Sequence, residues 1–130
     1  MESLPAGLVQ FARAHMRSVE DLQVFIVCVD HRDRWWDAAG IAGAAAISES
    51  RARRILDQLA RANLLDIRIS DAVRFRFAPG VEELEQQAIS FASAYHSNPA
   101  AVVRLIASSA VPDSVRDFAD AFRIRRDDDR

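Results

Sequence analysis

The sequence predicts a mostly α-helical fold with one small β-hairpin, and two patterns in its middle third predict this. Apolar residues recur at spacings of three and four along residues 48–62, as the stripe Ala52, Ile55, Leu56 and Leu59. Such a stripe is typical of an amphipathic helix. Apolar and arginine residues then alternate along residues 73–77, which is the period of a half-buried strand. With 130 residues, half of them hydrophobic, the chain is expected to form one domain, residues 1–130.

The first part of the chain predicts two helices. Apolar residues at helical spacing indicate an N-terminal helix within residues 1–17. Ser18 is a suitable N-cap for the next helix, which is expected to end near His31. Asp21, three residues after Ser18, would complete a capping-box-like pair.

Residues 34–36, Arg-Trp-Trp, are expected to form a short strand that pairs with the hairpin. Because neighbouring residues of a strand point to opposite sides, one of Trp35 and Trp36 should lie in the core and the other opposite it. The alternative for a partly exposed tryptophan is an anchor for a binding partner.

A helix, a turn, a second helix and the hairpin follow. The first of these helices is expected at residues 37–45 and the second at residues 48–62, with Ser48 as its N-cap. Asn63 then accepts the left-handed conformation that ends many helices. The hairpin occupies residues 66–77, with its turn at Ser70, Asp71 and Ala72.

The C-terminal third predicts three short amphipathic helices. They are expected at residues 81–95, 100–109 and 114–124, with a break at His96 and Ser97. A small hairpin domain has limited surface to cover three apolar stripes. Part of this apolar area is therefore expected to meet a second copy of the chain.

The segments I-S-E-S-R-A-R-R-I-L-D-Q-L-A-R-A-N-L-L (47–65) and R-F-A-P-G (76–80) resemble the winged helix–turn–helix of bacterial transcription regulators, most closely the MarR-like group. The resemblance implies a winged helix–turn–helix core at 18–78 with extra N- and C-terminal helices at 1–17 and 81–124. It also implies a homodimer formed through the terminal helices. The chain departs from the family pattern at Ala46 and Asn63, where glycine is usual.

Charge is distributed unevenly along the chain. The formal net charge is −2 and the pI about 5.9, which argues against a protein that coats nucleic acid without discrimination. Residues 48–78 nevertheless contain seven arginines and four acidic residues, so this region is basic and the remainder acidic. All 17 basic residues are arginine, which indicates the codon bias of a GC-rich bacterium before any functional choice of arginine over lysine.

These features lead to the hypothesis of a sequence-specific DNA-binding transcriptional regulator. The helix from Ser48 to Ala62 would enter the major groove of double-stranded DNA, and the 66–77 hairpin would serve as the wing. The residues expected to face base edges are Ser50, Arg51 and Arg54. The residues expected to meet phosphates or an adjacent minor groove are Arg53, Arg61, Arg68, Arg74 and Arg76.

Two other functions stay open. The first is a winged-helix adaptor that binds another protein and not DNA, which the low pI favours. The second is small-molecule sensing by a pocket at the dimer interface, which would accompany DNA binding and not replace it. The sequence contains no recognisable catalytic motif, phosphate loop or metal-ligand spacing, so no enzyme activity, cofactor or metal is expected. Cys28 is expected to be a buried thiol, and the protein is expected in the cytoplasm with no membrane segment.

Overall fold

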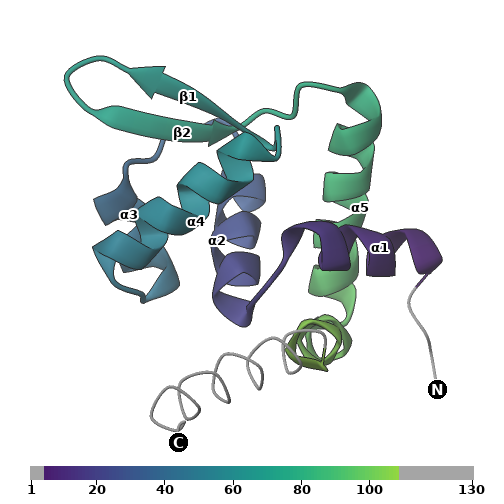
Figure 1. Ribbon diagram of the computed structural model, residues 1–130. Helices are drawn as coiled ribbons and strands as arrows, with labels where there is room; N and C mark the ends of the chain where they lie inside the picture. The colour runs from purple at the N-terminus through teal and green to yellow at the C-terminus, as the bar shows by residue number, and fades with distance from the viewer. Residues whose placement is uncertain (1–4, 109–130) are drawn as a thin grey trace, which may run out of the picture.

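The computed structural model describes residues 5–108 and has the predicted winged helix–turn–helix fold (Figure 1). Its elements are α1 (Ala6–His15), α2 (Val19–Asp30), α3 (Ala38–Ala45), α4 (Glu49–Arg61), β1 (Leu65–Ile69), β2 (Val73–Phe77) and α5 (Glu82–Ser97). Residues 99–108 are also helical. No helix in the described part of the chain is long and apolar enough to cross a membrane.

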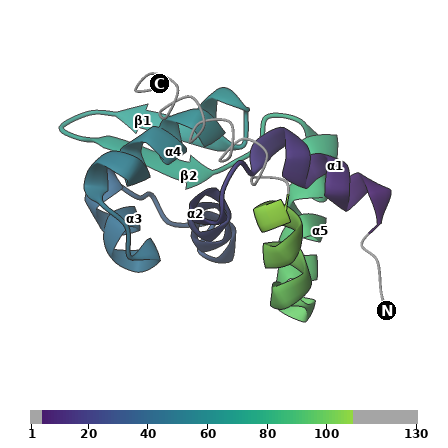
Figure 2. The same ribbon diagram turned by 60° about the horizontal axis from the view of Figure 1, so that its bottom comes forward.

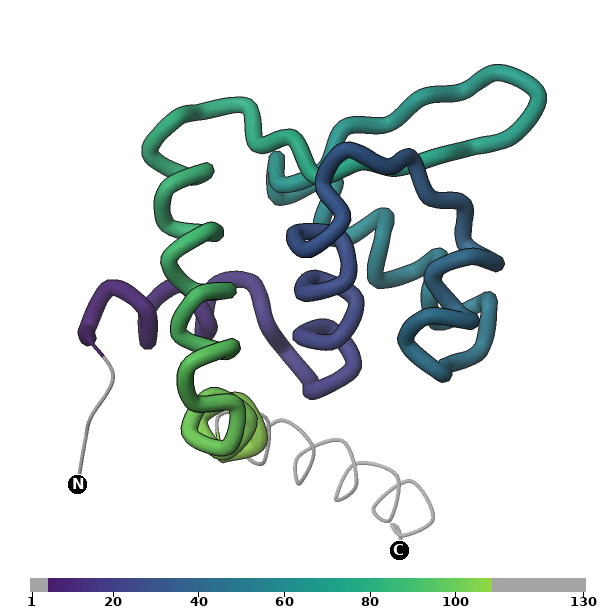
Figure 3. The backbone as a smooth tube through the Cα atoms, turned by 180° about the vertical axis from the view of Figure 1, so that it is seen from behind, coloured from purple at the N-terminus to yellow at the C-terminus, as the bar shows by residue number. Residues whose placement is uncertain are grey.

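Helix α2 lies at the centre of the molecule and contacts α3, α4, α5 and β2 (Figure 3). Its Phe25 is fully buried and touches aromatic rings from three other elements. The ring centroids of Phe11 in α1, Phe91 in α5 and Phe77 in β2 lie 5.6, 5.9 and 6.3 Å from that of Phe25. Burial of these rings joins the two ends of the chain to the helix–turn–helix unit.

The cap expected before α2 is present, and the structure adds one before α3. The Ser18 hydroxyl accepts a hydrogen bond from the Asp21 N–H at 3.2 Å, and the Asp37 carboxylate accepts one from the Gly40 N–H at 2.8 Å. Each cap satisfies a backbone donor that the first turn of a helix leaves without a partner. The order and bounds of α2 and α3 agree with the sequence predictions to within one residue.

Helix α4 also begins as predicted, since the Ser48 hydroxyl accepts a hydrogen bond from the Arg51 N–H at 3.2 Å. A left-handed residue lies just beyond each of these two helices, with φ of 60° at Ala46, directly after α3, and 69° at Asn63, two residues after α4. Asparagine tolerates this conformation better than most residues, whereas alanine is strained in it. The turn between α3 and α4 therefore contains a left-handed residue although that residue is not glycine.

Strands β1 and β2 form the antiparallel hairpin, with Ile67 opposite Phe75. Trp36 joins its edge through a single bridge, in which the Trp36 N–H donates to the Phe75 carbonyl and the Phe75 N–H donates to the Trp36 carbonyl, both at 2.7 Å. Trp36 is buried and Trp35 is partly exposed on the opposite side. The prediction that one tryptophan is buried and the other lies opposite it is confirmed. The predicted strand at residues 34–36 is wrong, because only Trp36 pairs with the hairpin.

The C-terminal region differs from the prediction at one point. The predicted break at His96 and Ser97 was wrong, because α5 continues through both residues and ends before Asn98. His96 is held in the last turn by a 2.8 Å contact between its Nε2 and Asp30 Oδ1 of α2, which sequence periodicity does not reveal. The predicted helix at 114–124 and residues 1–4 lie outside the described residues.

We predict that Ala46→Gly stabilises the protein. A left-handed backbone costs an L-residue roughly 1–2 kcal/mol, and glycine offsets part of that gain by losing more entropy on folding, so the free energy of unfolding should rise by about 0.5–1 kcal/mol. Urea denaturation followed by circular dichroism measures this change. The control is Ala44→Gly in the exposed helical part of α3, which should destabilise by about 0.5–1 kcal/mol. Destabilisation by both variants would show that Ala46 is not strained.

Candidate nucleic-acid interface

Helices α3 and α4 and the hairpin together form one end of the molecule. In Figures 1, 2 and 3 this end lies opposite α1 and α5. Helix α4 contacts α3, α2 and β1, so the buried face of α4 is turned to the body and its other face to solvent. All eight residues predicted to contact DNA lie on α4 or on the hairpin.

The outward face of α4 carries Ser50, Arg54, Asp57 and Arg61. These four residues recur at spacings of four and three on the side opposite the buried Ala52, Ile55, Leu56 and Leu59. Arg54 and Arg61 are exposed and form no ion pair within residues 5–108. Their guanidinium groups are therefore available to an external anion.

Arg51 lies on the flank of α4 that faces α2. Its Nη1 donates to Glu20 Oε2 at 2.6 Å, although more than half of the Arg51 side chain is exposed. The sequence predicts Arg51 as a base-reading residue, and the structure places a competing carboxylate beside it. An exposed ion pair of this kind contributes only about 0.2–1 kcal/mol, so a strong external acceptor can displace Glu20.

A buried hydrogen-bond cluster lies next to this ion pair. Asp21 is only 5% exposed, and its carboxylate accepts from the backbone N–H of Arg17 at 2.9 Å, the Ser18 hydroxyl at 3.2 Å and Gln58 Nε2 at 3.1 Å. Buried carboxylates need such donors because they have lost their hydration. The Gln58 contact therefore fixes the orientation of α4 on the N-terminal end of α2.

Arg53 occupies the other flank of α4, toward the hairpin. Its Nε lies 3.2 Å from Asp57 Oδ1, one helical turn later, and its guanidinium lies 5.9 Å from the ring centroid of Phe75. About half of the Arg53 side chain is exposed. Arg53 is thus placed between α4 and the wing, where a phosphate could contact both elements.

The wing carries its arginines on one face. Arg68 and Arg76 both lie over the ring of Trp35, with guanidinium carbons 4.8 and 4.5 Å from the ring centroid. Arg74 approaches Asp71 at the turn, at 3.5 Å. The pKa of Asp71 is lowered, first by the Ser70 hydroxyl that donates to it and then by a backbone hydrogen bond and the nearby Arg74 charge.

The structure thus places the predicted residues at one end of the molecule, but they differ in whether their side chains contact a carboxylate, an aromatic ring or neither. The sequence indicated a capping role for Asp21, but not that Glu20 and Asp21 contact α4. It also did not reveal the stacking of Trp35 against the wing arginines. One sequence pattern could have indicated the stacking of Trp35. Arg74 and Arg76 alternate with apolar residues, so they lie on one face of the hairpin, which an outward tryptophan of the preceding segment could reach.

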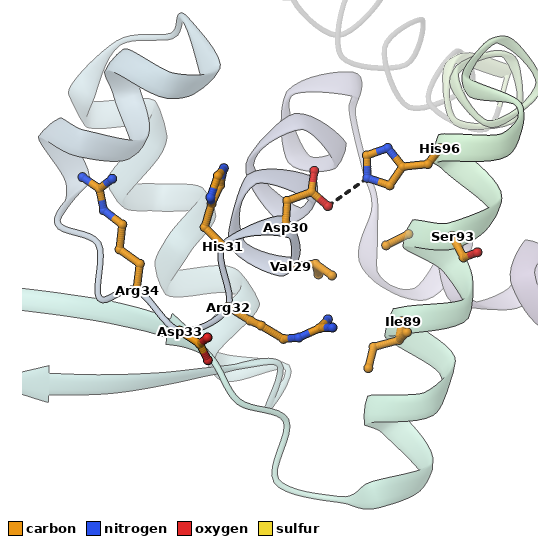
Figure 4. A pocket seen from close by; sticks show the side chains of 10 residues that line it. Val29, Asp30, His31, Arg32, Asp33, Arg34, Ile89, Ser93 and His96 are labelled. Carbon is orange, nitrogen blue, oxygen red and sulfur yellow. Dashed lines mark hydrogen bonds and ion pairs between the residues drawn. The ribbon is translucent and has the colours of Figure 1, made fainter.

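A separate open cleft of about 800 Å³ lies between the end of α2, the loop at residues 31–34 and α5 (Figure 4). Its apolar wall includes Val29 and Ile89, and Arg32 extends from the loop toward Ile89. The pair Asp30–His96 lies at one end. Acidic and basic groups alternate along this lining, so the cleft does not favour either sign of ligand charge.

The titratable groups of the core offer no reactive centre. Cys28 is fully buried, and desolvation raises the pKa of its thiol to about 12. Partial burial lowers the pKa of His15, whose ring lies against Phe11 with centroids 4.7 Å apart. Within residues 5–108 no three His, Cys, Asp or Glu side chains group together as metal ligands.

Comparison with known proteins gives one structural similarity. No family model matches the chain, and no curated protein matches its sequence. The structure is similar to the crystal structure of a MarR family transcriptional regulator from Silicibacter pomeroyi DSS-3. The two chains are 20% identical, the match covers 88% of this chain and 85% of the other, and the TM-score is 0.48.

We predict that Cys28 is inert in the folded protein. Its burial and raised pKa leave almost no thiolate at pH 8, and thiolate is the reactive form. A chromogenic disulfide reagent should therefore react only at the rate of protein opening, and at once in 6 M guanidinium, where one thiol per chain is expected. Rapid stoichiometric labelling of the native protein would contradict the buried position of Cys28.

Proposed function

We propose that the protein is a sequence-specific DNA-binding transcriptional regulator. Helix α4 enters the major groove and reads bases with Ser50, Arg54 and, once released from Glu20, Arg51. The wing contacts the phosphate backbone with Arg68, Arg74 and Arg76, while Arg53 and Arg61 contact phosphates beside α4.

One observation carries this proposal above the others. The exposed face of α4 presents Arg54 and Arg61 on the same end of the molecule as the arginine-bearing face of the hairpin. A basic helix beside a basic hairpin is the combination that the major groove and its flanking phosphates would attract. The acidic remainder of the chain would repel DNA and so favour this one end.

The regulator is proposed to act as a homodimer through its terminal helices. Val103 and Leu105 of the last described helical segment keep part of their surface exposed, and an apolar groove lies between α1 and α5. A two-fold axis would let two α4 helices meet half-sites about one turn of DNA apart. Light scattering coupled to gel filtration tests the dimer directly.

A second function, an adaptor for another protein, is favoured by the apolar edge of the wing. Ile69 is 76% and Ile67 43% exposed, so β1 presents apolar surface to solvent. A DNA-binding assay distinguishes the two functions, because a regulator would bind DNA in a salt-dependent way and an adaptor would not. Binding of genomic fragments, measured by fluorescence anisotropy across a salt series, is the deciding experiment.

We predict that Arg54→Ala relaxes base recognition. The lost contact should cost on the order of 1–3 kcal/mol on the selected operator and much less on scrambled DNA, because a base contact contributes only at its own position. Anisotropy titrations on both duplexes measure the difference. The control is Arg13→Ala, which removes the same charge from exposed α1 at the opposite end of the molecule. Equal losses on both duplexes would remove Arg54 from base reading.

We predict that Glu20→Gln strengthens DNA binding. The substitution frees Arg51 and removes a negative charge beside the interface, so affinity should rise by up to about fivefold, in line with the ~0.2–1 kcal/mol of an exposed ion pair. Glu83→Gln in the first turn of α5 makes the same charge change far from α4 and serves as the control. If both variants bind alike, Glu20 does not compete with DNA for Arg51.

A further inference from the structure

Trp35 lies between two arginines of the wing. The guanidinium carbon of Arg68 in β1 is 4.8 Å from its ring centroid, and that of Arg76 in β2 is 4.5 Å away. Trp35 is partly exposed and lies on the side of its segment opposite the buried Trp36. The paired backbone of Trp36 and Phe75 fixes this position.

The two arginines have few other partners. Arg68 lies directly opposite Arg74 across the hairpin, so their like charges repel. Arg76 lies opposite Asp66, but Asp66 Oδ1 accepts from the backbone N–H of Ile67 at 2.9 Å. Within residues 5–108 neither Arg68 nor Arg76 forms an ion pair. Among side chains, the Trp35 ring is therefore what holds their guanidinium groups.

A guanidinium over an aromatic ring keeps its hydrogen-bonding capacity. The attraction acts between the cation and the ring face, whereas the five N–H donors point outward in the guanidinium plane. A side chain ordered before binding also loses less entropy when it contacts a ligand. Two such groups beside one ring suit a polyanion with regularly spaced phosphates.

We propose that Trp35 is a positioning residue for DNA binding, which holds Arg68 and Arg76 as a preorganised clamp for the phosphodiester backbone. This inference rests on the proposed function and adds a residue that touches no base. The clamp recognises phosphate and not sequence, so its contribution is the same on operator and scrambled DNA.

The first test compares Trp35→Leu with Trp35→Phe on a scrambled duplex in a salt series. Leucine removes the ring face, and affinity should fall roughly fivefold, whereas phenylalanine retains a face and should stay within about twofold. Trp35→Leu made in an Arg68→Ala/Arg76→Ala background should cause no further loss, because the coupled partners are gone. Ile69→Ala, at the exposed tip of the same hairpin, is the control and should bind like the wild type.

A second test leaves Trp35 in place and so does not depend on the folding of its variants. Arg68→Lys/Arg76→Lys keeps both charges but loses the planar group that stacks, so affinity should fall roughly threefold. The clamp would be overturned if the Arg68→Lys/Arg76→Lys variant bound DNA as tightly as the wild type. It would also be overturned if Trp35→Leu weakened binding equally in the Arg68→Ala/Arg76→Ala background. In both cases the proposed regulator function would stand. Failure of the wild type to bind any duplex would instead overturn the proposed function and the clamp with it.

Discussion

The wing depends on the pair of backbone hydrogen bonds between Trp36 and Phe75. They tie the segment after α2 to the second strand, and the buried Phe75 ring then anchors the hairpin on the core. An isolated two-stranded hairpin is marginal in water, so this third backbone partner and the packing beneath it are needed for its stability. The same bridge decides that Trp36 points into the core and Trp35 toward the arginines.

Helix α4 is oriented by polar contacts as well as by its apolar stripe. Asp21 is buried with three donors, one of which is Gln58 of α4, so this hydrogen bond adds a specific contact between α4 and α2. The neighbouring Glu20 is only partly buried, and its ion pair with Arg51 stays open to solvent. Two adjacent acids at the start of α2 therefore have different effects, because Asp21 has lost its hydration and Glu20 keeps part of it.

Three residue choices that do not favour the local structure lie at the proposed interface. Alanine occupies a left-handed position between α3 and α4, Arg68 and Arg74 repel each other across the hairpin, and Ile69 is exposed at its tip. The first two features lower stability slightly and the exposed Ile69 adds little to it, and such features are often found where function constrains the chain. DNA phosphates would relieve the repulsion between the wing arginines, which links this local cost to the proposed activity.

The sequence by itself determined the elements of this protein, because caps and periodicities are local. Ser18 and Ser48 cap their helices as the sequence predicted, and the alternation at residues 73–77 forms a strand. Only the tertiary structure decided which arginines contact other side chains and which do not. Arg51 meets Glu20 and Arg68 meets Trp35 across long stretches of chain, and His96 extends α5 by meeting Asp30. Contacts between distant residues depend on how the elements pack, which no local pattern specifies.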